Sequence, residues 1–343
     1  MDKKVVFAVA GSGKTKLIID ELDEHKKSVV ITYTTSNFEN LKERIIKKFG
    51  YFPPNIKIYT YFTFLYSFCY KPFCNDLMKT KGINYFQQPN QYSKKGTRDH
   101  YVDKSDKLFF SRISKLIIEY NVIDDVVARI DKYFDNIFID EIQDFASNDF
   151  NFIVALSATK TNLIYVGDFY QHTFDTSRDG TTRKSLHENY AKYQKEFQSG
   201  GISVDISTLI KSWRCNTTIC QYIFENLKIP IESNSTATSI IKNLTDEKEI
   251  IQVFNDNAII KLFYKEHYNF DCFSKNWGDC KGEDKYYDVC VVLNNTSYDK
   301  FLKNDLNNLA LATKNKLYVA ISRTKNNLYF VSEKLLKQTL IKL

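Results

Sequence analysis

The sequence lacks any apolar run that approaches the roughly 20 residues of a membrane-spanning helix. No secretory signal peptide is expected either, because the first residues run directly into the short apolar stretch of the first predicted strand. These two absences exclude the membrane class and favour a cytoplasmic protein without a membrane partner.

The spacing of the cysteines is typical neither of a metal site nor of the disulfide framework of a secreted protein. The seven cysteines are odd in number and form no CxxC pair, and four residues separate Cys69 from Cys74 and Cys215 from Cys220. Buried free thiols explain this usage better than a disulfide framework or a metal or iron–sulfur site.

Internal repeats are absent, and the composition is that of an ordinary globular protein. A chain of 343 residues with 43% hydrophobic and 26% charged residues is long enough for two compact domains. The net charge of +7 is compatible with a nucleic-acid partner. Because lysine and asparagine are abundant everywhere, a compositional bias explains the charge equally well.

The most informative stretch stands near the start of the chain. Residues 5–9 are predicted to form a buried strand, and the loop that follows leads into a helix and consists of Ala10, Gly11, Ser12, Gly13, Lys14 and Thr15. Glycines let the backbone N–H groups converge on phosphate oxygens, Lys14 can reach the β and γ phosphates, and the Thr15 hydroxyl can bind Mg²⁺. Ala8 replaces the first glycine of the G-x-x-x-x-G-K-[ST] pattern. Taken alone, the stretch also fits a plain glycine turn between a strand and a helix.

Apolar strands and amphipathic helices alternate along the rest of the chain. Further strands are predicted at 28–32, 56–60, 137–139, 163–166, 203–207, 249–254, 289–293 and 328–331. Helices are predicted at 38–49, 217–227 and 309–321. This alternation implies parallel sheets.

The chain divides into two predicted domains. The first covers 1–182 and contains an insertion of loop and helices at about 71–132, where a polar stretch precedes renewed helical periodicity. The second covers 183–343.

An acidic pair follows the apolar run 137–139. Asp140 can hold Mg²⁺ directly or through water, and Glu141 can act as general base toward an attacking water. A solvated acidic loop is the alternative, but it leaves the apolar strand before the pair unexplained.

With Asp-Glu-x-Gln-Asp at 140–144, the sequence resembles the UvrD/Rep/PcrA-type superfamily 1 helicases and translocases. Residues 167–171 (Gly-Asp-Phe-Tyr-Gln) are similar to the family's third motif, 212–214 (Ser-Trp-Arg) to the fourth and 319–323 (Val-Ala-Ile-Ser-Arg) to the sixth. The motifs keep the family's order over nearly the whole chain. The resemblance implies an α/β fold of two RecA-like P-loop NTPase domains with parallel sheets and a small helical insertion in the first domain.

The resemblance also implies a set of nucleotide-site residues and the cofactors ATP and Mg²⁺. Gln171 would sense the γ-phosphate, while Arg214 and Arg323 would reach the same ATP from the second domain and join Glu141 in catalysis. The segment 281–283 (Lys-Gly-Glu) resembles the fifth motif without its leucine. The resemblance implies Glu283 as the sugar contact, and because the leucine is missing, Asp284 is a competing candidate for that place.

Two further segments are similar to the family's DNA-contacting motifs, at 32–35 and 60–64. The implied contacts with single-stranded DNA or a tailed duplex are Tyr33, Thr34, Thr60, Phe64 and Phe174. For Phe64, core packing is an equal alternative. The family's direction of movement implies translocation from 3′ to 5′.

Two function hypotheses stay open. Only 66 residues separate Arg214 from Lys281, where the family carries its large second-domain insertion, so the chain resembles a reduced motor. The first hypothesis is an ATP-dependent single-stranded DNA translocase or helicase. The second is a DNA-sensing regulatory ATPase that controls a partner nuclease in genome maintenance or antiviral defence, or that acts through self-association.

Overall fold

The computed structural model describes residues 2–90 and 92–341. The chain forms two compact units, the first from 2–7, 14–167 and 174–205, and the second from 8–13, 168–173 and 206–341. Among the described residues, no helix has the length and apolar character needed to cross a membrane.

The first unit is built on a six-stranded sheet in which every pairing is parallel, with the order β3-β2-β6-β7-β1-β8. Its strands are β1 (Lys3–Phe7), β2 (Ser28–Thr32), β3 (Ile56–Thr60), β6 (Asn136–Ile139), β7 (Asn162–Gly167) and β8 (Ser203–Asp205). The expected parallel sheet is confirmed. The first strand lies two residues earlier than predicted at both ends, so residues 8 and 9 already belong to the loop that follows it.

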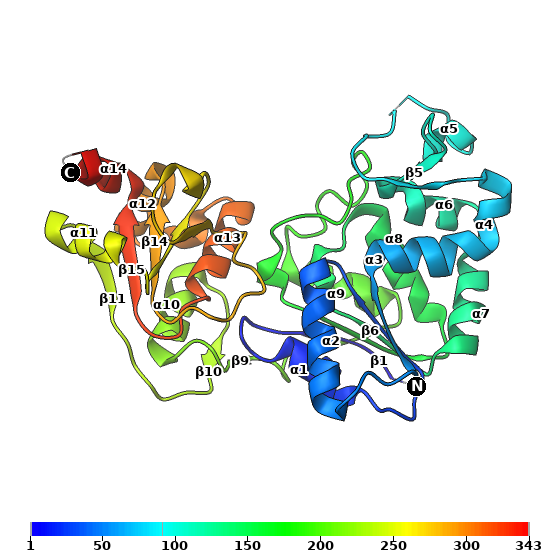
Figure 1. The fold of residues 1–343 in the computed structure, drawn as a ribbon, viewed down its shortest axis with the longest axis horizontal. Coiled ribbons are helices and arrows are strands. Elements are labelled where there is room, and N and C mark those ends of the chain that lie inside the picture. The colour runs from blue at the N-terminus through cyan, green and yellow to red at the C-terminus, as the bar shows by residue number, and fades with distance from the viewer. Residues whose placement is uncertain (1, 91, 342–343) are drawn as a thin grey trace. The chain divides into compact units, whose positions relative to one another are not determined.

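Helices flank this sheet, and Figure 1 shows α1 and α2 side by side in front of it. They are α1 (Lys14–Glu21), α2 (Thr35–Phe49), α3 (Tyr61–Thr63), α8 (Ser147–Ala155) and α9 (Tyr190–Ser199). Local signals fix the ends of α2: the Thr34 side chain accepts a hydrogen bond from the Asn37 N–H, and Gly50 closes the helix with φ of 82°.

The expected insertion is present between β3 and β6. It consists of α4 (Lys71–Met78), β4 (Gly82–Asn84), α5 (Arg98–Tyr101), β5 (Lys107–Phe109), α6 (Ile113–Glu119) and α7 (Ile123–Tyr133). A π-helical turn, η1 (Phe64–Tyr70), leads into it. The part of the insertion where helical periodicity was expected to resume, from about residue 107, begins instead with β5, which pairs with β4 in parallel.

The second unit is built on a five-stranded parallel sheet with the order β11-β15-β14-β12-β13. Its strands are β11 (Ile241–Leu244), β12 (Ile260–Phe263), β13 (Ser274–Asn276), β14 (Val289–Leu293) and β15 (Leu328–Ser332), with a separate pair, β9 (Lys211–Ser212) and β10 (Glu232–Ser233). Its helices are α10 (Thr217–Leu227), α11 (Glu247–Asn255), α12 (Asn295–Leu302), α13 (Leu311–Ile321) and α14 (Glu333–Ile341).

The strand predicted at 249–254 is wrong, because these residues form helix α11. The Asp246 carboxylate accepts hydrogen bonds from the N–H groups of Lys248 and Glu249 and caps the helix. Ile250, Val253 and Phe254 are the buried residues of α11, and their spacing has the period of a helix.

The domain boundary expected between 182 and 183 also differs from the observed one. Strand β8 pairs with β1 at the edge of the first sheet, so the first unit extends to Asp205. The backbone hydrogen bonds of β8 are made with β1, so β8 belongs to the first unit.

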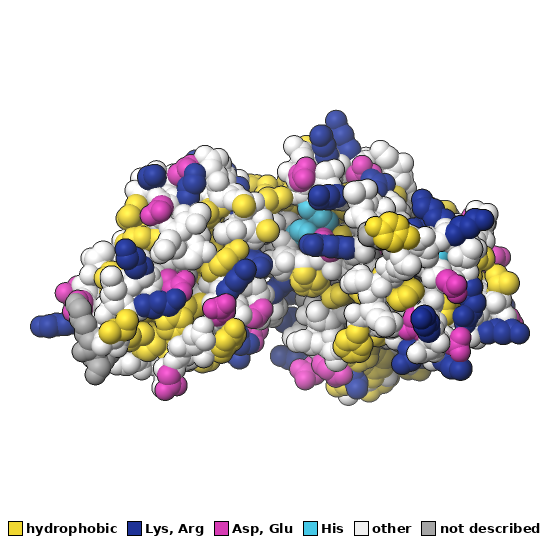
Figure 2. Space-filling view, turned by 90° about the horizontal axis from the view of Figure 1, so that it is seen from above, with side chains coloured by type: hydrophobic (Ala, Val, Ile, Leu, Met, Phe, Trp, Pro, Cys, Tyr) yellow, Lys and Arg dark blue, Asp and Glu magenta, His cyan; other side chains and the backbone are white. Residues whose placement is uncertain are grey.

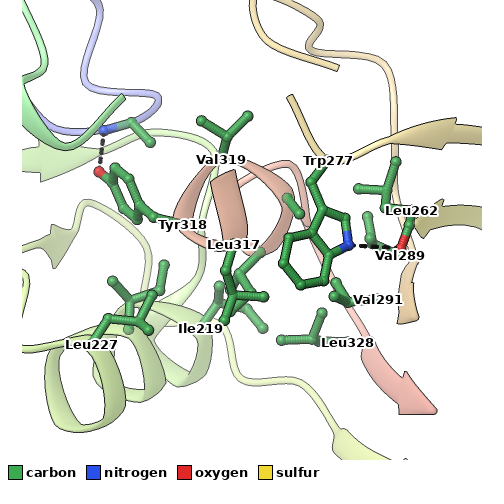
Figure 3. Packing of buried hydrophobic residues seen from close by; sticks show 14 of the residues in the cluster. Ile219, Leu227, Leu262, Trp277, Val289, Val291, Leu317, Tyr318, Val319 and Leu328 are labelled. Atoms are coloured by element: carbon green, nitrogen blue, oxygen red, sulfur yellow. Dashed lines mark hydrogen bonds between the residues drawn. The ribbon is translucent and has the colours of Figure 1, made fainter. Parts of the chain in front are cut away.

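The second unit has an apolar core between its sheet and helices α10 and α13 (Figure 3). Ile219 and Leu227 of α10 and Leu317 of α13 face the core. The Trp277 ring is fully buried there, and its indole N–H donates to the Leu262 carbonyl at 2.9 Å. This core holds α13 in place, and α13 carries residues toward the candidate site.

Candidate nucleotide and nucleic-acid site

The phosphate-loop sequence adopts a conformation that only glycine takes without strain. Gly11 has φ of 70° and Gly13 has φ of 99°, both in the left-handed region. The Ser12 hydroxyl donates to the Val9 carbonyl at 2.8 Å and closes the turn between them. Helix α1 begins at Lys14, directly after the loop, so its N-terminus adds a favourable environment for an anion.

Residues 8–13 of this loop pack within the second unit. The Gly11 carbonyl accepts a hydrogen bond from the Trp213 N–H at 2.8 Å. A Cβ on Gly11 would come within 2.6 Å of the Arg214 Cβ and 2.8 Å of the Ser212 Oγ. The motif that contains Arg214 therefore lies directly against the loop, and Gly11 is required for this contact as well as for its φ.

A tyrosine that sequence reasoning missed joins the loop to a second motif. The hydroxyl of Tyr318, on α13, accepts a hydrogen bond from the Ala10 N–H at 2.9 Å (Figure 3). The same hydroxyl donates to Asp168 Oδ2 at 3.1 Å. Burial, followed by the nearby Asp168 charge, raises the pKa of Tyr318 well above its ordinary value, so the hydroxyl keeps its proton. The signal in the sequence was a tyrosine inside an aliphatic helical run, since a buried hydroxyl needs a partner.

Asp168 in turn organises the turn that carries Gln171. Asp168 Oδ1 accepts a hydrogen bond from the Tyr170 N–H at 3.1 Å and caps the short 3₁₀ turn Phe169–Gln171. Gln171 is buried, and its Nε2 has no hydrogen-bond partner among the described residues. A buried amide donor without a partner is costly, and a bound ligand oxygen would satisfy it.

The acidic pair lies at the carboxyl end of β6 in the first unit. Asp140 and Glu141 are both buried, and Glu141 has a left-handed φ of 55°. The Glu141 N–H donates to Asp140 Oδ1 at 2.9 Å, and Gln143 Nε2 donates to Glu141 Oε2 at 2.5 Å. Strained backbone of this kind concentrates at functional sites, where surrounding contacts hold it.

Gly167, at the end of β7, has no side chain, so the residues that follow β6 can pack directly against it. A Cβ at this position would come 2.3 Å from Gln143 Oε1 and 3.0 Å from the Ile142 N–H nitrogen. A larger residue would therefore displace the glutamine that holds Glu141.

Oxygen ligands of the kind that Mg²⁺ prefers are present in the predicted set, from the Thr15 hydroxyl and the Asp140 carboxylate. The donor types fit the ion. The roles of Thr15 and Asp140 as ligands stay predictions.

The two predicted arginines lie near each other in the second unit. Arg214 Nε donates to Asp284 Oδ1 at 2.6 Å, and its Nη1 donates to the Ser322 carbonyl at 3.2 Å. Arg323 is almost fully buried, and its Nη1 donates to the Glu283 carbonyl at 2.9 Å. Burial, followed by the Arg214 charge, lowers the pKa of Arg323 to about 10, so the guanidinium stays positive near neutral pH.

The two candidates for the sugar contact have different partners. The Glu283 carboxylate accepts from Lys275 Nζ at 2.6 Å and from the Tyr286 hydroxyl. Although burial acts to raise the pKa of Glu283, its bonds to Lys275 and Tyr286 lower it below the usual range. Asp284, the competitor, holds Arg214 instead. The sugar contact of Glu283 stays a prediction.

The residues predicted to contact DNA separate into two groups. Tyr33 is partly exposed, and its ring lies 5.2 Å from that of Phe174 and 6.0 Å from that of Phe62. Phe64, by contrast, is fully buried and stacks on Phe68 at 5.2 Å. The prediction for Phe64 is therefore wrong, because a ring with no exposed face cannot stack on a base.

The two predicted threonines shape the backbone beside these rings. The Thr34 hydroxyl accepts a hydrogen bond from the Asn37 N–H at 3.1 Å, as the cap of α2. The Thr60 hydroxyl is 2.8 Å from that of Thr63, at the start of α3. Any contact of either hydroxyl with DNA stays a prediction.

Comparison with known proteins supports the fold. No protein-family model matches the chain, and no curated protein matches it. The chain is similar to the solved structure of the PRRSV helicase, with 13% identity over 96% of this chain and 52% of that one and a TM-score of 0.48. It is also similar to arterivirus nonstructural protein 10, a helicase solved in complex with DNA, with 13% identity over 98% of this chain and 63% of that one and a TM-score of 0.51.

The chain thus spans between half and two thirds of the length of these helicases. The likeness to the arterivirus protein shows that the two parallel sheets correspond to the two RecA-like domains of a helicase fold. The expected fold class is confirmed, while the UvrD-type branch stays a prediction.

Proposed function

We propose that this protein is a superfamily 1 motor that hydrolyses ATP with Mg²⁺ and moves on single-stranded DNA, from 3′ to 5′. The observation that carries the proposal is the pairing of a phosphate-loop sequence after β1 with a strained, buried Asp140-Glu141 pair after β6 of the same parallel sheet. Ligands of open parallel sheets bind at the carboxyl ends of the strands, where both features stand.

Each residue has a role that its surroundings support. Lys14 binds the β and γ phosphates, and Glu141, held by Gln143, takes the proton of the attacking water. Mg²⁺ at Thr15 and Asp140 would neutralise phosphate charge. Gln171 donates its free amide to the γ-phosphate or to the attacking water.

Arg214 and Arg323, both in the second unit, have a proposed catalytic role. The positive charges of Arg214 and Arg323 stabilise the charge that develops on the transferred phosphoryl group. Tyr33, Thr34, Thr60 and Phe174 contact the single strand. This DNA surface rests on the resemblance of the motifs and on the partly exposed rings of Tyr33 and Phe174.

The test compares two variants that should both abolish turnover but differ in ATP binding. Lys14→Ala removes a phosphate contact, so both ATP binding and turnover should be lost, whereas Glu141→Gln removes the base and should retain bound ATP. Glu188→Gln, which neutralises an exposed carboxylate of the first unit, is the matched control. ATPase rates are measured with and without single-stranded DNA, and nucleotide binding by equilibrium titration. Wild-type turnover in Glu141→Gln would refute the assigned base.

A regulatory switch is the second candidate, and the small size of the second unit favours it. The residues between Arg214 and Lys281 form α10, β11, α11, β12 and β13, so they build the second unit itself, and the described chain forms only two compact units. Less surface is then available to hold a duplex. Single-strand stimulation of ATPase without strand displacement on a tailed duplex would favour a switch that acts through a partner such as a nuclease or through self-association.

A further inference from the structure

Five aromatic side chains of the first unit form a continuous strip. We use the name aromatic strip for Tyr33, Phe62, Tyr85, Phe110 and Phe174. The Tyr85 ring lies 5.6 Å from the Phe62 ring and 6.1 Å from the Phe110 ring, to which it is nearly parallel at 27°. The strip thus extends the candidate DNA surface from the end of β2 into the insertion.

Part of the strip is open to solvent. Tyr85 is 50% exposed, and its neighbour Phe86 is 95% exposed. Tyr33, Phe110 and Phe174 are partly exposed, while Phe62 lies beneath them. A contiguous exposed aromatic surface marks an interaction site more often than a scattered exposed ring does.

The insertion that supplies Tyr85 and Phe110 also carries positive charge. Residues 71–115 contain ten Lys and Arg but four Asp and Glu, whereas the whole insertion, 71–133, has a net charge of +4. Lys94, Lys95 and Lys104 are exposed and pair with no carboxylate of the described residues. Exposed dark blue side chains lie among yellow ones over the surface in Figure 2. The positive excess thus lies in the part of the insertion that also contains Tyr85 and Phe110.

We propose that Tyr85 and Phe110 form a seat for unpaired bases of single-stranded DNA, continuous with Tyr33 and Phe174. Lys94, Lys95 and Lys104 neutralise the phosphates of the same strand. This inference rests on the proposed function and adds binding residues that come from the insertion, outside the motifs at 32–35 and 60–64.

Two properties select single-stranded DNA as the occupant. Flat aromatic faces stack on any base, and the exposed lysines of the insertion complement a phosphate backbone. A duplex satisfies only the second property, because its bases are already stacked on one another. Excess duplex of the same length should therefore compete poorly for the seat.

The experiment measures binding of a fluorescein-labelled oligothymidylate by fluorescence anisotropy. Tyr85→Ala should weaken binding about 5-fold to 100-fold, because a base then has no aromatic face on which to stack. Tyr85→Phe retains the ring and should bind like the wild type. Tyr51→Ala is the matched control, since Tyr51 is 51% exposed in the same unit but precedes β3, at the amino ends of the parallel strands, whereas Tyr33 follows β2 at their carboxyl ends.

The lysines are tested through salt dependence. Replacing Lys94 and Lys95 together by alanine should lower the slope of log affinity against log salt by about 0.7 for each phosphate that the protein no longer neutralises. Phe110→Ala gives an independent test of the seat if Tyr85→Ala fails to fold. The ATPase rate without DNA is measured for the Tyr51→Ala control, where it should equal that of the wild type.

The outcomes separate this inference from the proposed function. Wild-type affinity in both Tyr85→Ala and Phe110→Ala, together with weakened binding in Tyr33→Ala, would overturn the seat and leave the motor intact. Equal weakening in Tyr51→Ala, or equal competition by duplex, would also overturn it. If the wild-type protein did not bind single-stranded DNA, the proposed function itself would be refuted.

Discussion

The hydroxyl of Tyr318 is a single atom that holds two motifs, and Tyr318→Phe removes it while keeping the ring in the core. The hydroxyl accepts from the Ala10 N–H at 2.9 Å and donates to Asp168 at 3.1 Å, and the side chain is fully buried. The variant should therefore loosen the phosphate loop and the Gln171 turn together. We expect lower stability of the second unit and weaker ATP binding.

The magnitude follows from the two bonds. A hydrogen bond to a charged group contributes about 1.5–3 kcal/mol and one between neutral groups about 0.5–1.5 kcal/mol. Because the two bonds share one hydroxyl, we expect a loss of about 2–4 kcal/mol in the free energy of unfolding.

The assay uses the fluorescence of the chain's own tryptophans during urea unfolding. Both tryptophans, Trp213 and Trp277, belong to the second unit, so the signal reports that unit. The urea concentration at the midpoint of unfolding should be lower for Tyr318→Phe than for the wild type, while the dependence of the unfolding free energy on urea stays unchanged.

Tyr222→Phe is the matched control for this prediction. Tyr222 packs against the same core, but its hydroxyl is buried without a hydrogen-bond partner among the described residues. Its removal should change stability by less than about 0.5 kcal/mol or raise it slightly. Equal effects of Tyr318→Phe and Tyr222→Phe would refute the reasoning, because the cost would then come from the ring environment and not from the two bonds.

Buried groups support three further predictions. Arg323→Ala should lower turnover by orders of magnitude with a smaller loss of ATP affinity, measured as kcat and as the nucleotide dissociation constant; an unchanged kcat would contradict its proposed role. Gly167→Ala should destabilise the fold by about 1–3 kcal/mol and slow turnover, because a Cβ would come 2.3 Å from Gln143 Oε1; wild-type thermal stability would show that the neighbours yield freely. Asp179 is partly buried, which acts to raise its pKa, but the hydrogen bond from Lys115 helps to lower it below 3.8. Because its pKa is lower in the folded state, the charged Asp179 carboxylate stabilises the fold at pH values above its unfolded-state pKa. Asp179→Asn should therefore lower the free energy of unfolding by its full amount near neutral pH, and by less as the pH falls below 3.8. A loss of stability that is the same at every pH would exclude this ionic contribution.

The sequence by itself determined the features that depend on neighbouring residues. The strands Ser28–Thr32, Ile56–Thr60 and Val289–Leu293 and the helix Thr217–Leu227 begin and end where their apolar patterns predicted. The phosphate loop followed from the order of strand, glycines and helix. These signals are local because hydrophobic periodicity and glycine conformation act within a few residues.

Local reasoning failed where two local signals compete. The run 249–254 contains Ile, Ile, Val and Phe, which favour a strand, yet the Asp246 cap and the spacing of the buried residues make it helical. The domain boundary predicted at 182 was wrong for a different reason. Whether 203–205 pairs with β1 depends on a partner about 200 positions away, which no local pattern records.

Tertiary structure alone decided which aromatic side chains face solvent. Phe64 and Tyr33 both stand in segments similar to DNA-contacting motifs, but Phe64 stacks in the core while Tyr33 joins an open strip with Tyr85 and Phe110. Tyr318 likewise gains its importance from Ala10 and Asp168, which are far from it in the chain and meet only in the folded second unit. Burial and hydrogen bonding are relations between distant residues, and a sequence specifies such relations only through the packing of the whole fold.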